Sequence, residues 1–390
     1  MRTRRRAKKT PIIITLLILI GLIFGSLYIF NEYFSKDKKE EKPTELNKEE
    51  ESTPKKYSGS FTAAGNILVN SNMWYDTLAE DNTYDFTHVF GKLEKFIKKS
   101  NVNFYSAQSI IGGKELGLSA YYSYNSPVEV ADVMVNMGFN MVSLASTHSY
   151  DKAVRGITNS INYWNGKKIA YSGMSISAGE RLKNNIITKN EVAYGLLSYT
   201  MGTDIKFNDD YSVNVYSEEL VKSDVEAIKN LVDVLVVSID WHDIKSNDVT
   251  DKQVNVAKYL SSLGVDIVLG NTGFSIQPIE TIDNTLVFYS MGNLLSGHVS
   301  VDSRISMIAD FDVTLNKTKT KTSLTFSDVD VMLIYAYNKD NTNYQIIPFS
   351  EITTELSNYK TYHDKYSELL TNNKDYIKVD KLGEESGSWE

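Results

Sequence analysis

The chain has 390 residues, of which 42% are hydrophobic and 23% charged, and it contains six prolines and no cysteine. This composition is typical of a globular protein and excludes a wholly disordered, collagen-like or coiled-coil chain. The lack of cysteine also excludes disulfide scaffolds, zinc fingers with cysteine ligands and thiol nucleophiles. Five histidines, at positions 88, 148, 242, 298 and 363, remain for any imidazole-based site.

The formal net charge of −8 is unevenly distributed along the chain. Residues 1–34 hold six of the 41 Lys and Arg and one of the 49 Asp and Glu, so the remainder carries −13. Nucleic-acid binding depends on basic patches that neutralise phosphates. An acidic body of this kind therefore predicts no nucleic-acid partner.

The N-terminal region predicts one transmembrane helix over residues 12–34. Residues 1–11 contain six basic side chains, and the 19 residues from Ile12 to Phe30 carry no charge. Nineteen helical residues rise about 28 Å, close to the thickness of the hydrocarbon core. The bulky residues Leu27 to Phe30 do not resemble a signal-peptidase site, so an uncleaved anchor is favoured over a cleaved signal peptide. The basic tail 1–11 then stays in the cytoplasm, and the protein is a single-pass type II protein of the cell membrane with its bulk outside the cell.

The remainder divides into a stalk, a folded domain and a C-terminal extension. Residues 35–57 are rich in Lys and Glu and almost devoid of apolar side chains, which predicts a disordered stalk. We expect the folded extracellular domain over residues 58–345. A helical extension and a charged tail follow over residues 346–390.

Short apolar runs alternate with amphipathic helical patterns in the first part of the folded domain. Ser126, Pro127 and Glu129 predict the N-cap, the first helical position and a capping box of a helix that ends at Gly138. The alternation of strand, helix and strand predicts an α/β fold whose sheet is covered by helices. The predicted strands are 61–69, 139–145, 233–239 and 265–269, and the further predicted helices are 217–231 and 250–263, with Thr250 and Gln253 as a capping box.

After Thr285 the pattern changes to strands without intervening helices. These strands predict antiparallel additions to the sheet or a second sheet. They are expected at 286–290, 305–315, 322–326 and 329–337.

Polar clusters follow five strands at their carboxyl ends, an edge that we call the strand-end rim. Sites in open α/β sheets form at this edge, so the recurrence predicts a functional site there. The alternative for each cluster taken alone is an ordinary hydrogen-bonded structural group. The clusters are Gly65-Asn66, Ser146-Thr147-His148 with Asp151, Asp240-Trp241-His242-Asp243, Gly270-Asn271-Thr272 and Gly292-Asn293.

Several of these segments resemble the capsule-synthesis (CapA, poly-γ-glutamate biosynthesis) proteins. Residues 142–148 (VSLASTH) with Asp151 resemble that family's SLANNH…D, and residues 236–241 (VVSIDW) resemble its VVSLHWG. Residues 263–270 (LGVDIVLG) resemble AGADIVIG, and residues 277–280 (QPIE) with 289–293 (YSMGN) resemble QPIE…YSLGN. The similarity covers about Ser60 to Gly297. It implies a fold like that of the calcineurin-like metallophosphatases, a layered α-β-β-α sandwich with two divalent metals at the strand ends.

Most positions that the resemblance assigns to metal ligands carry other residues. His148 is kept, but two metals need three or more good ligands each, so we do not expect a tightly bound pair. The changed positions are Asn66 for Asp, Ser109 for the bridging Glu, Thr147 for Asn, Asp240 for His, and Asn271 and Phe274 for a pair of His. Asn66, Ser109, Thr147, Asn271 and Asn293 are the expected ligand-binding positions of the rim.

A site for a single metal ion, built in part from residues other than the family's ligands, stays open as an alternative. His148, Asp240 and His242 could hold a single Mn²⁺ or Zn²⁺, and these three are also the candidate catalytic residues. Asp240 and His242 lie two positions apart, so an extended backbone would point both side chains to the same side.

Together these features predict a membrane-anchored extracellular CapA-like protein that takes part in the synthesis of a capsule or a poly-γ-glutamate-type surface polymer. We expect a non-catalytic scaffold or polymer-binding protein without a cofactor, whose partners are the membrane, capsule or polyglutamate synthase membrane proteins and the anionic polymer. The alternatives are a metal-dependent hydrolase or ligase-type enzyme and a surface interaction protein with no polymer role. Tyr121 to Tyr124 could form an aromatic platform for a polymer, although packing against the body is the more common role of such residues.

Overall fold

A computed structural model describes residues 55–380, apart from residues 98, 243, 272–273 and 319–321. The predicted cytoplasmic tail 1–11, the transmembrane segment 12–34, most of the stalk and residues 381–390 lie outside the described residues. Among the helices that are described, none is long and apolar enough to cross a membrane. The described residues belong to one compact unit.

The larger of two β-sheets has ten strands in the order β15-β14-β12-β1-β2-β3-β4, with β11, β13 and β16 paired to β1, β12 and β14. One half is parallel, because β1, β2, β3 and β4 run in the same direction. The other half is antiparallel, through β12, β14 and β15. The strands are β1 (Lys55–Ile67), β2 (Val102–Ala107), β3 (Met141–Ser143), β4 (Ala170–Ser172), β11 (Asn293–Leu295), β12 (Ile305–Lys317), β13 (Thr322–Phe326), β14 (Val329–Lys339), β15 (Thr342–Pro348) and β16 (Ile377–Val379).

The smaller sheet has six strands in the order β5-β6-β7-β8-β10-β9. Its four central strands are parallel, and an antiparallel strand closes each edge. The strands are β5 (Ile186–Lys189), β6 (Val192–Thr200), β7 (Val234–Asp240), β8 (Ile267–Asn271), β9 (Ile279–Ile282) and β10 (Thr285–Phe288).

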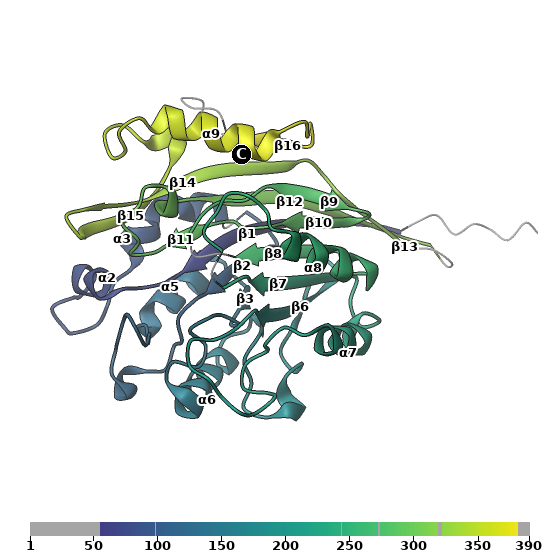
Figure 1. Cartoon of the computed structure of the whole chain (residues 1–390), viewed down its shortest axis with the longest axis horizontal. Helices are drawn as coiled ribbons and strands as arrows, with labels where there is room; N and C mark the ends of the chain where they lie inside the picture. Colours follow the sequence, from purple (N-terminus) through teal and green to yellow (C-terminus); the bar gives the residue numbers. More distant parts are fainter. Residues whose placement is uncertain (1–54, 98, 243, 272–273, 319–321, 381–390) are drawn as a thin grey trace, which may run out of the picture. The chain divides into compact units, whose positions relative to one another are not determined.

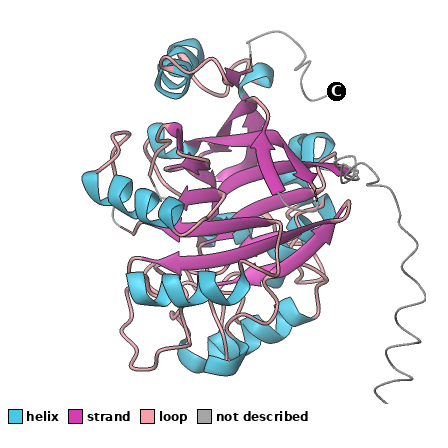
Figure 2. Cartoon of the chain, turned by 90° about the vertical axis from the view of Figure 1, so that its right-hand side faces the viewer, coloured by secondary structure: helices cyan, strands magenta, loops and turns pink. Residues whose placement is uncertain are grey.

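The two sheets pack face to face, and helices cover the outer face of each (Figures 1 and 2). The core between the sheets joins residues such as Phe104 of the larger sheet to Leu196 and Val236 of the smaller one. On the outer face of the larger sheet lie α2 (Ser71–Asp76), α3 (Thr87–Phe90), α4 (Glu94–Ile97), α5 (Val128–Met137) and α6 (Ala153–Asn165), and on that of the smaller sheet lie α7 (Glu218–Ile228) and α8 (Asp251–Ser262). The chain is therefore a mixed α/β protein with helices outside two central sheets, in agreement with the predicted class.

The helix boundaries follow local signals, with one correction. Thr250 and Gln253 form the predicted capping box of α8. Helix α5 ends at Gly138, whose φ of 111° is left-handed, as glycine allows. Ser126 does not cap α5, because the N-cap residue is Pro127. The Ser126 hydroxyl instead forms a hydrogen bond with that of Ser109.

The ends of the folded domain differ from the composition-based boundaries. Strand β1 begins at Lys55, inside the predicted stalk, because Lys55 to Ser60 pair with the far end of β12. At the other end, α9 (Tyr359–Thr371) packs Tyr366 and Leu370 into the core shared by the two sheets, and β16 pairs with β14. In Figure 1, α9 lies at the top beside β14. The described part of the C-terminal extension is therefore integrated with the body.

Close approach of backbones at the end of β8 leads to a stability prediction. A Cβ atom on Gly270 would lie 2.0 Å from the Tyr289 carbonyl oxygen and 2.4 Å from Trp241 Nε1. Since this backbone cannot move aside freely, Gly270→Ala should lower the free energy of unfolding by about 1–3 kcal/mol. Denaturant unfolding measures this change. The control is Gly91→Ala, where nothing lies within 4 Å of the added atom; a Gly270→Ala protein as stable as the control would contradict the packing described.

Candidate functional site

The strand-end rim is formed by the carboxyl ends of strands from both sheets, and these ends meet at the Asp240 carboxylate, at the end of β7. This side chain is buried, with 2% of its surface exposed. Its Oδ2 atom accepts hydrogen bonds from the Thr147 backbone N–H (2.8 Å), the Thr147 hydroxyl (3.1 Å) and the Thr200 hydroxyl (2.8 Å). Its Oδ1 atom accepts from Gln108 Nε2 (3.2 Å) and from the His242 backbone N–H (3.4 Å). Donors from the protein itself thus occupy both oxygens.

This network joins the two sheets. Gln108 and Thr147 follow β2 and β3 of the larger sheet, whereas Thr200 and Asp240 end β6 and β7 of the smaller one. Burial raises the pKa of Asp240, while hydrogen bonds from Thr200, His242 and Thr147 oppose the rise. Hydrogen bonds to a buried carboxylate are among the stronger ones in proteins, so Asp240 acts as a polar cross-brace between the sheets.

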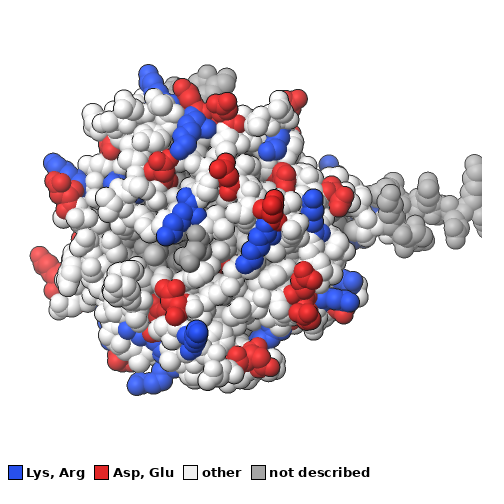
Figure 3. Space-filling model, in the orientation of Figure 1, with Lys and Arg blue, Asp and Glu red and all other residues white. Residues whose placement is uncertain are grey.

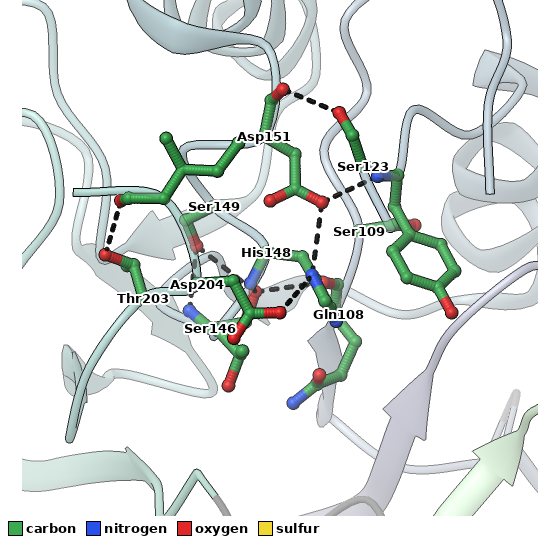
Figure 4. Close-up of polar contacts among 12 residues, drawn as sticks. Gln108, Ser109, Ser123, Ser146, His148, Ser149, Asp151, Thr203 and Asp204 are labelled. Carbon is green, nitrogen blue, oxygen red and sulfur yellow. Dashed lines mark hydrogen bonds and ion pairs between the residues drawn. The ribbon is translucent and has the colours of Figure 1, made fainter. Parts of the chain in front are cut away.

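His148 points toward two other carboxylates, those of Asp151 and Asp204 (Figure 4). Its Nδ1 atom lies 3.1 Å from Asp151 Oδ2 and 3.7 Å from Asp204 Oδ2. Asp151 is fully buried as a side chain, whereas Asp204 is 49% exposed. The ring of Tyr124 packs against the imidazole, with 4.5 Å between centroids. The contacts of His148 therefore differ from those expected for a site shared with Asp240.

His242 approaches Asp240 through Thr147. The Thr147 hydroxyl lies 2.9 Å from His242 Nδ1 and also donates to Asp240. The backbone at His242 is left-handed, with a φ of 62°. The expectation of an extended backbone at this position was wrong, although both side chains reach the same threonine. Asp243 lies outside the described residues.

The other predicted rim residues are buried and are used mainly by the fold. Asn66 pairs in register with Asn293, and the Asn293 side chain donates to the Ser303 carbonyl oxygen at 3.1 Å. Ser109 is turned toward Ser126 at the start of α5. Asn271 donates to Ser238 Oγ and to the Leu269 carbonyl oxygen, both at 3.2 Å. Of these four predicted positions, Ser109 pairs with His148 through an isolated parallel β-bridge. Asn66, Asn271 and Asn293 lie near strand ends and are used by the fold.

A layer of small polar side chains lies beneath the cross-brace, between the two sheets. The Ser198 backbone N–H donates to Ser172 Oγ at 3.1 Å and so links the sheets directly. Small side chains on both facing surfaces let two sheets approach more closely than the usual ~10 Å. The members are Ser106, Ser143, Ser172, Ser198, Ser238 and Asn271, each at most 1% exposed.

Comparison with known proteins places the chain in a family. The family model for "Bacterial capsule synthesis protein PGA_cap" matches residues 60–298. The chain belongs to this family. The resemblance read from residues 142–151 and 236–293 is thereby confirmed, and the PGA_cap match contains the whole cross-brace.

Two curated relatives carry related names. The chain is 26% identical over 195 residues to "PGA biosynthesis protein CapA" of Bacillus subtilis, covering 49% of this chain and 51% of the relative. It is 24% identical over 201 residues to "Capsule biosynthesis protein CapA" of Bacillus anthracis, covering 49% and 48%. The chain thus spans about half the length of the curated relatives it matches.

One solved structure shows remote similarity. A Staphylococcus aureus protein designated a 5'-nucleotidase, in complex with alpha-ketoglutarate, is 10% identical with a TM-score of 0.38. The comparison covers 80% of this chain and 59% of that one.

The side chains of this PGA_cap protein do not fit the pair of divalent metals that the resemblance implied. In the described portion of the chain, no group of three or more His, Asp or Glu is placed to hold a metal ion. Asp240 already accepts from protein donors, and Asn66, Ser109 and Thr147 offer no charge to balance a cation. The Asn271 Oδ1 atom is buried without a hydrogen-bond partner among the described residues, but it is a single neutral oxygen.

Sequence reasoning missed three residues of this site. Thr200 ends β6, a strand whose residues are buried on both faces and so lack the alternation of a half-buried strand. Asp204 follows in the next loop, and its backbone N–H donates to the Thr147 carbonyl oxygen at 3.0 Å. Gln108 directly precedes the expected rim position Ser109, but nothing in the residues around it indicates that it donates to Asp240. Recognising the strand at 192–200 would have added Thr200 to the rim.

Substitution of Asp240 should cost stability. In Asp240→Asn one acceptor oxygen becomes an NH₂ donor that faces the donors of Thr147, Thr200 or Gln108. We expect a loss of about 2–3 kcal/mol in the free energy of unfolding, because buried donors lose a charged acceptor. Denaturant unfolding at neutral pH measures the change.

The matched control is Asp204→Asn, a half-exposed carboxylate on the same rim. It should change the free energy of unfolding by less than about 1 kcal/mol, as is usual for exposed ion pairs. Equal stability of Asp240→Asn and the unchanged protein would show that the network does not brace the sheets.

Proposed function

We propose that this PGA_cap protein takes part in the synthesis of a capsule or a poly-γ-glutamate-type surface polymer as a membrane-anchored, extracellular and non-catalytic scaffold or polymer-binding protein. Membership of the family supports the link to capsule synthesis. The names of the two Bacillus relatives point to the same process. The basic residues and the uncharged run at 12–30 support the anchor.

One observation carries the non-catalytic part of the proposal. A carboxylate that serves as a metal ligand must offer a free lone pair toward the ion. Asp240 receives three hydrogen bonds at Oδ2 and two at Oδ1, all from the protein. The residue best suited by charge to replace the missing ligands is therefore used to hold the sheets together.

The surface charge does not favour a nucleic-acid partner. On the face shown in Figure 3, Lys and Arg are interspersed with Asp and Glu over the described residues. Nucleic-acid binding would call for a continuous basic surface. The proposed partners are membrane-embedded capsule or polyglutamate synthases and the anionic polymer that they make.

Metal content tests the proposal directly. The full chain, purified in detergent without chelator, should contain less than one Mn²⁺ or Zn²⁺ per chain by elemental analysis, because the rim lacks a set of charged ligands. Addition of EDTA should leave the melting temperature unchanged, since an ion that does not bind cannot stabilise by linkage. Phosphomonoesters and phosphodiesters should not be hydrolysed above background. His148→Ala should restore surface polymer to a deletion strain as well as the unchanged gene does.

The competing function is a hydrolase or ligase-type enzyme with one metal bound by His148, Asp240 and His242. It would be supported by one ion per chain that both His148→Ala and Asp240→Ala remove, together with loss of polymer in the His148→Ala strain. A gain-of-function control uses Asn66→Asp with Asn271→His. Increased metal affinity in that double variant would show that the rim retains the geometry of a metal site.

Topology is tested separately. Six basic residues before the uncharged run predict that the body lies outside the cell. Protease added to intact, wall-stripped cells should therefore digest the body while a cytoplasmic marker stays intact. Protection of the body until the membrane is permeabilised, or its release after cleavage near Phe30, would contradict the anchored topology.

A further inference from the structure

Two tyrosines stand out on the surface near His148. Tyr121 and Tyr122 are 72% and 75% exposed, and their ring centroids lie 3.8 Å apart at an interplanar angle of 33°. A hydrogen bond with the Tyr122 hydroxyl is the main cause that raises the pKa of Tyr121. The two rings thus form one unit, which we call the tyrosine plate. Packing of these rings against the body, the role expected from sequence, holds for Tyr124 but not for the plate.

The loop that carries the plate is held at both sides. Ser119 and Asn125 exchange backbone hydrogen bonds of 2.8 and 3.2 Å across its base. The Ser123 hydroxyl donates to the Asp151 carbonyl oxygen at 2.8 Å, and the Tyr124 backbone N–H donates to Asp151 Oδ2 at 2.6 Å. Rings on a fixed loop lose little conformational entropy when a ligand binds. The two exposed rings are therefore carried by a loop whose backbone is held in place.

The plate adjoins the polar groups of the rim. Tyr124, next but one to Tyr122, packs its ring on His148. Asp204 lies 3.7 Å from His148 Nδ1, and its half-exposed carboxylate is close enough to Tyr121 and Tyr124 for its charge to act on both. The loop that carries the two exposed rings and the half-exposed Asp204 carboxylate thus both adjoin His148.

We propose that the tyrosine plate, with Asp204 beside it, binds the pyranose rings of a neutral glycan chain. A pyranose ring has a C–H face that fits an aromatic ring and a hydroxyl edge that donates to a carboxylate. Tyrosine combines an apolar body with a polar tip, which suits such a ligand. This inference goes beyond the proposed function, because it holds whether or not the rim binds a metal.

Two other occupants fit less well. The two rings expose at most about 300–500 Å², and their surroundings are polar, whereas a stable protein interface buries about 800 Å² per partner around an apolar centre. A polyanion such as polyglutamate would be repelled by the nearby Asp204 and by the net negative charge of the chain, −8, since like charges cost free energy when brought together. A neutral glycan avoids both difficulties.

Calorimetric titration of the full chain with chitohexaose, a neutral oligosaccharide of six pyranose rings, tests the inference. We expect saturable binding that changes little between 50 and 500 mM NaCl, because no charge pair is involved. Tyr121→Ala with Tyr122→Ala should weaken binding about tenfold or more, whereas Tyr121→Phe with Tyr122→Phe keeps the ring faces and should stay within about threefold. Asp204→Asn should weaken binding less than removal of the rings.

The matched control is Tyr75→Ala, which removes an equally exposed tyrosine (71%) from α2. This variant should bind the oligosaccharide as the unchanged chain does. All of the variants should have the melting temperature of the unchanged chain. Absence of binding, or binding equal in the double alanine variant, would overturn the inference. Two other results would also overturn the inference, because they would assign the tyrosine plate to another ligand. One is salt-sensitive binding of polyglutamate that the double alanine variant loses, and the other is binding of a protein partner through the plate.

Discussion

The sharing of one buried carboxylate by two sheets is the interaction on which the rim depends. Asp240 ends a strand of the smaller sheet and accepts hydrogen bonds from Gln108 and Thr147, which follow strands of the larger one. A buried carboxylate without partners would be costly, so the donors and the acceptor stabilise one another only when the two rims are in register. The serine layer beneath and the absence of a side chain at Gly270 allow the close approach that this arrangement needs.

The same network shows that polar groups at the strand ends are satisfied within the fold itself. Function depends on particular side chains placed on a fold rather than on the fold itself. Here the strands still deliver polar groups to one edge, but Thr147 and Asp240 satisfy each other through two hydrogen bonds. Thr147 and Asp240 therefore help to hold the two sheets together. The half-exposed carboxylate of Asp204 lies outside this network, beside His148.

Much of the fold could be predicted because its local signals agree with its tertiary structure. The capping box at Thr250 and the glycine after α5 are short-range features, and both occur as predicted. The rim could be predicted as a place because parallel strands deliver their carboxyl ends to one edge. The contacts within the rim could not be predicted, because they join residues far apart in sequence, such as Gln108 and Asp240. The left-handed backbone at His242 also has only a weak signal in residue type, since histidine is enriched in this region but still adopts it in a small minority of cases.

Strand β1 has a mechanical consequence for the molecule. It runs from Lys55, where the residues before the domain join it, to Asn66 at the rim, a span of about 36 Å (Figure 1). Ten register pairs bind it to β12, and β2 flanks its other side. Because the hydrogen bonds of an antiparallel pair are perpendicular to the strands, tension applied at Lys55 along the strand loads them together in shear rather than opening them one by one. A force that pulls on Lys55, at the end of β1 opposite the rim, is thus resisted by the central strands of the larger sheet.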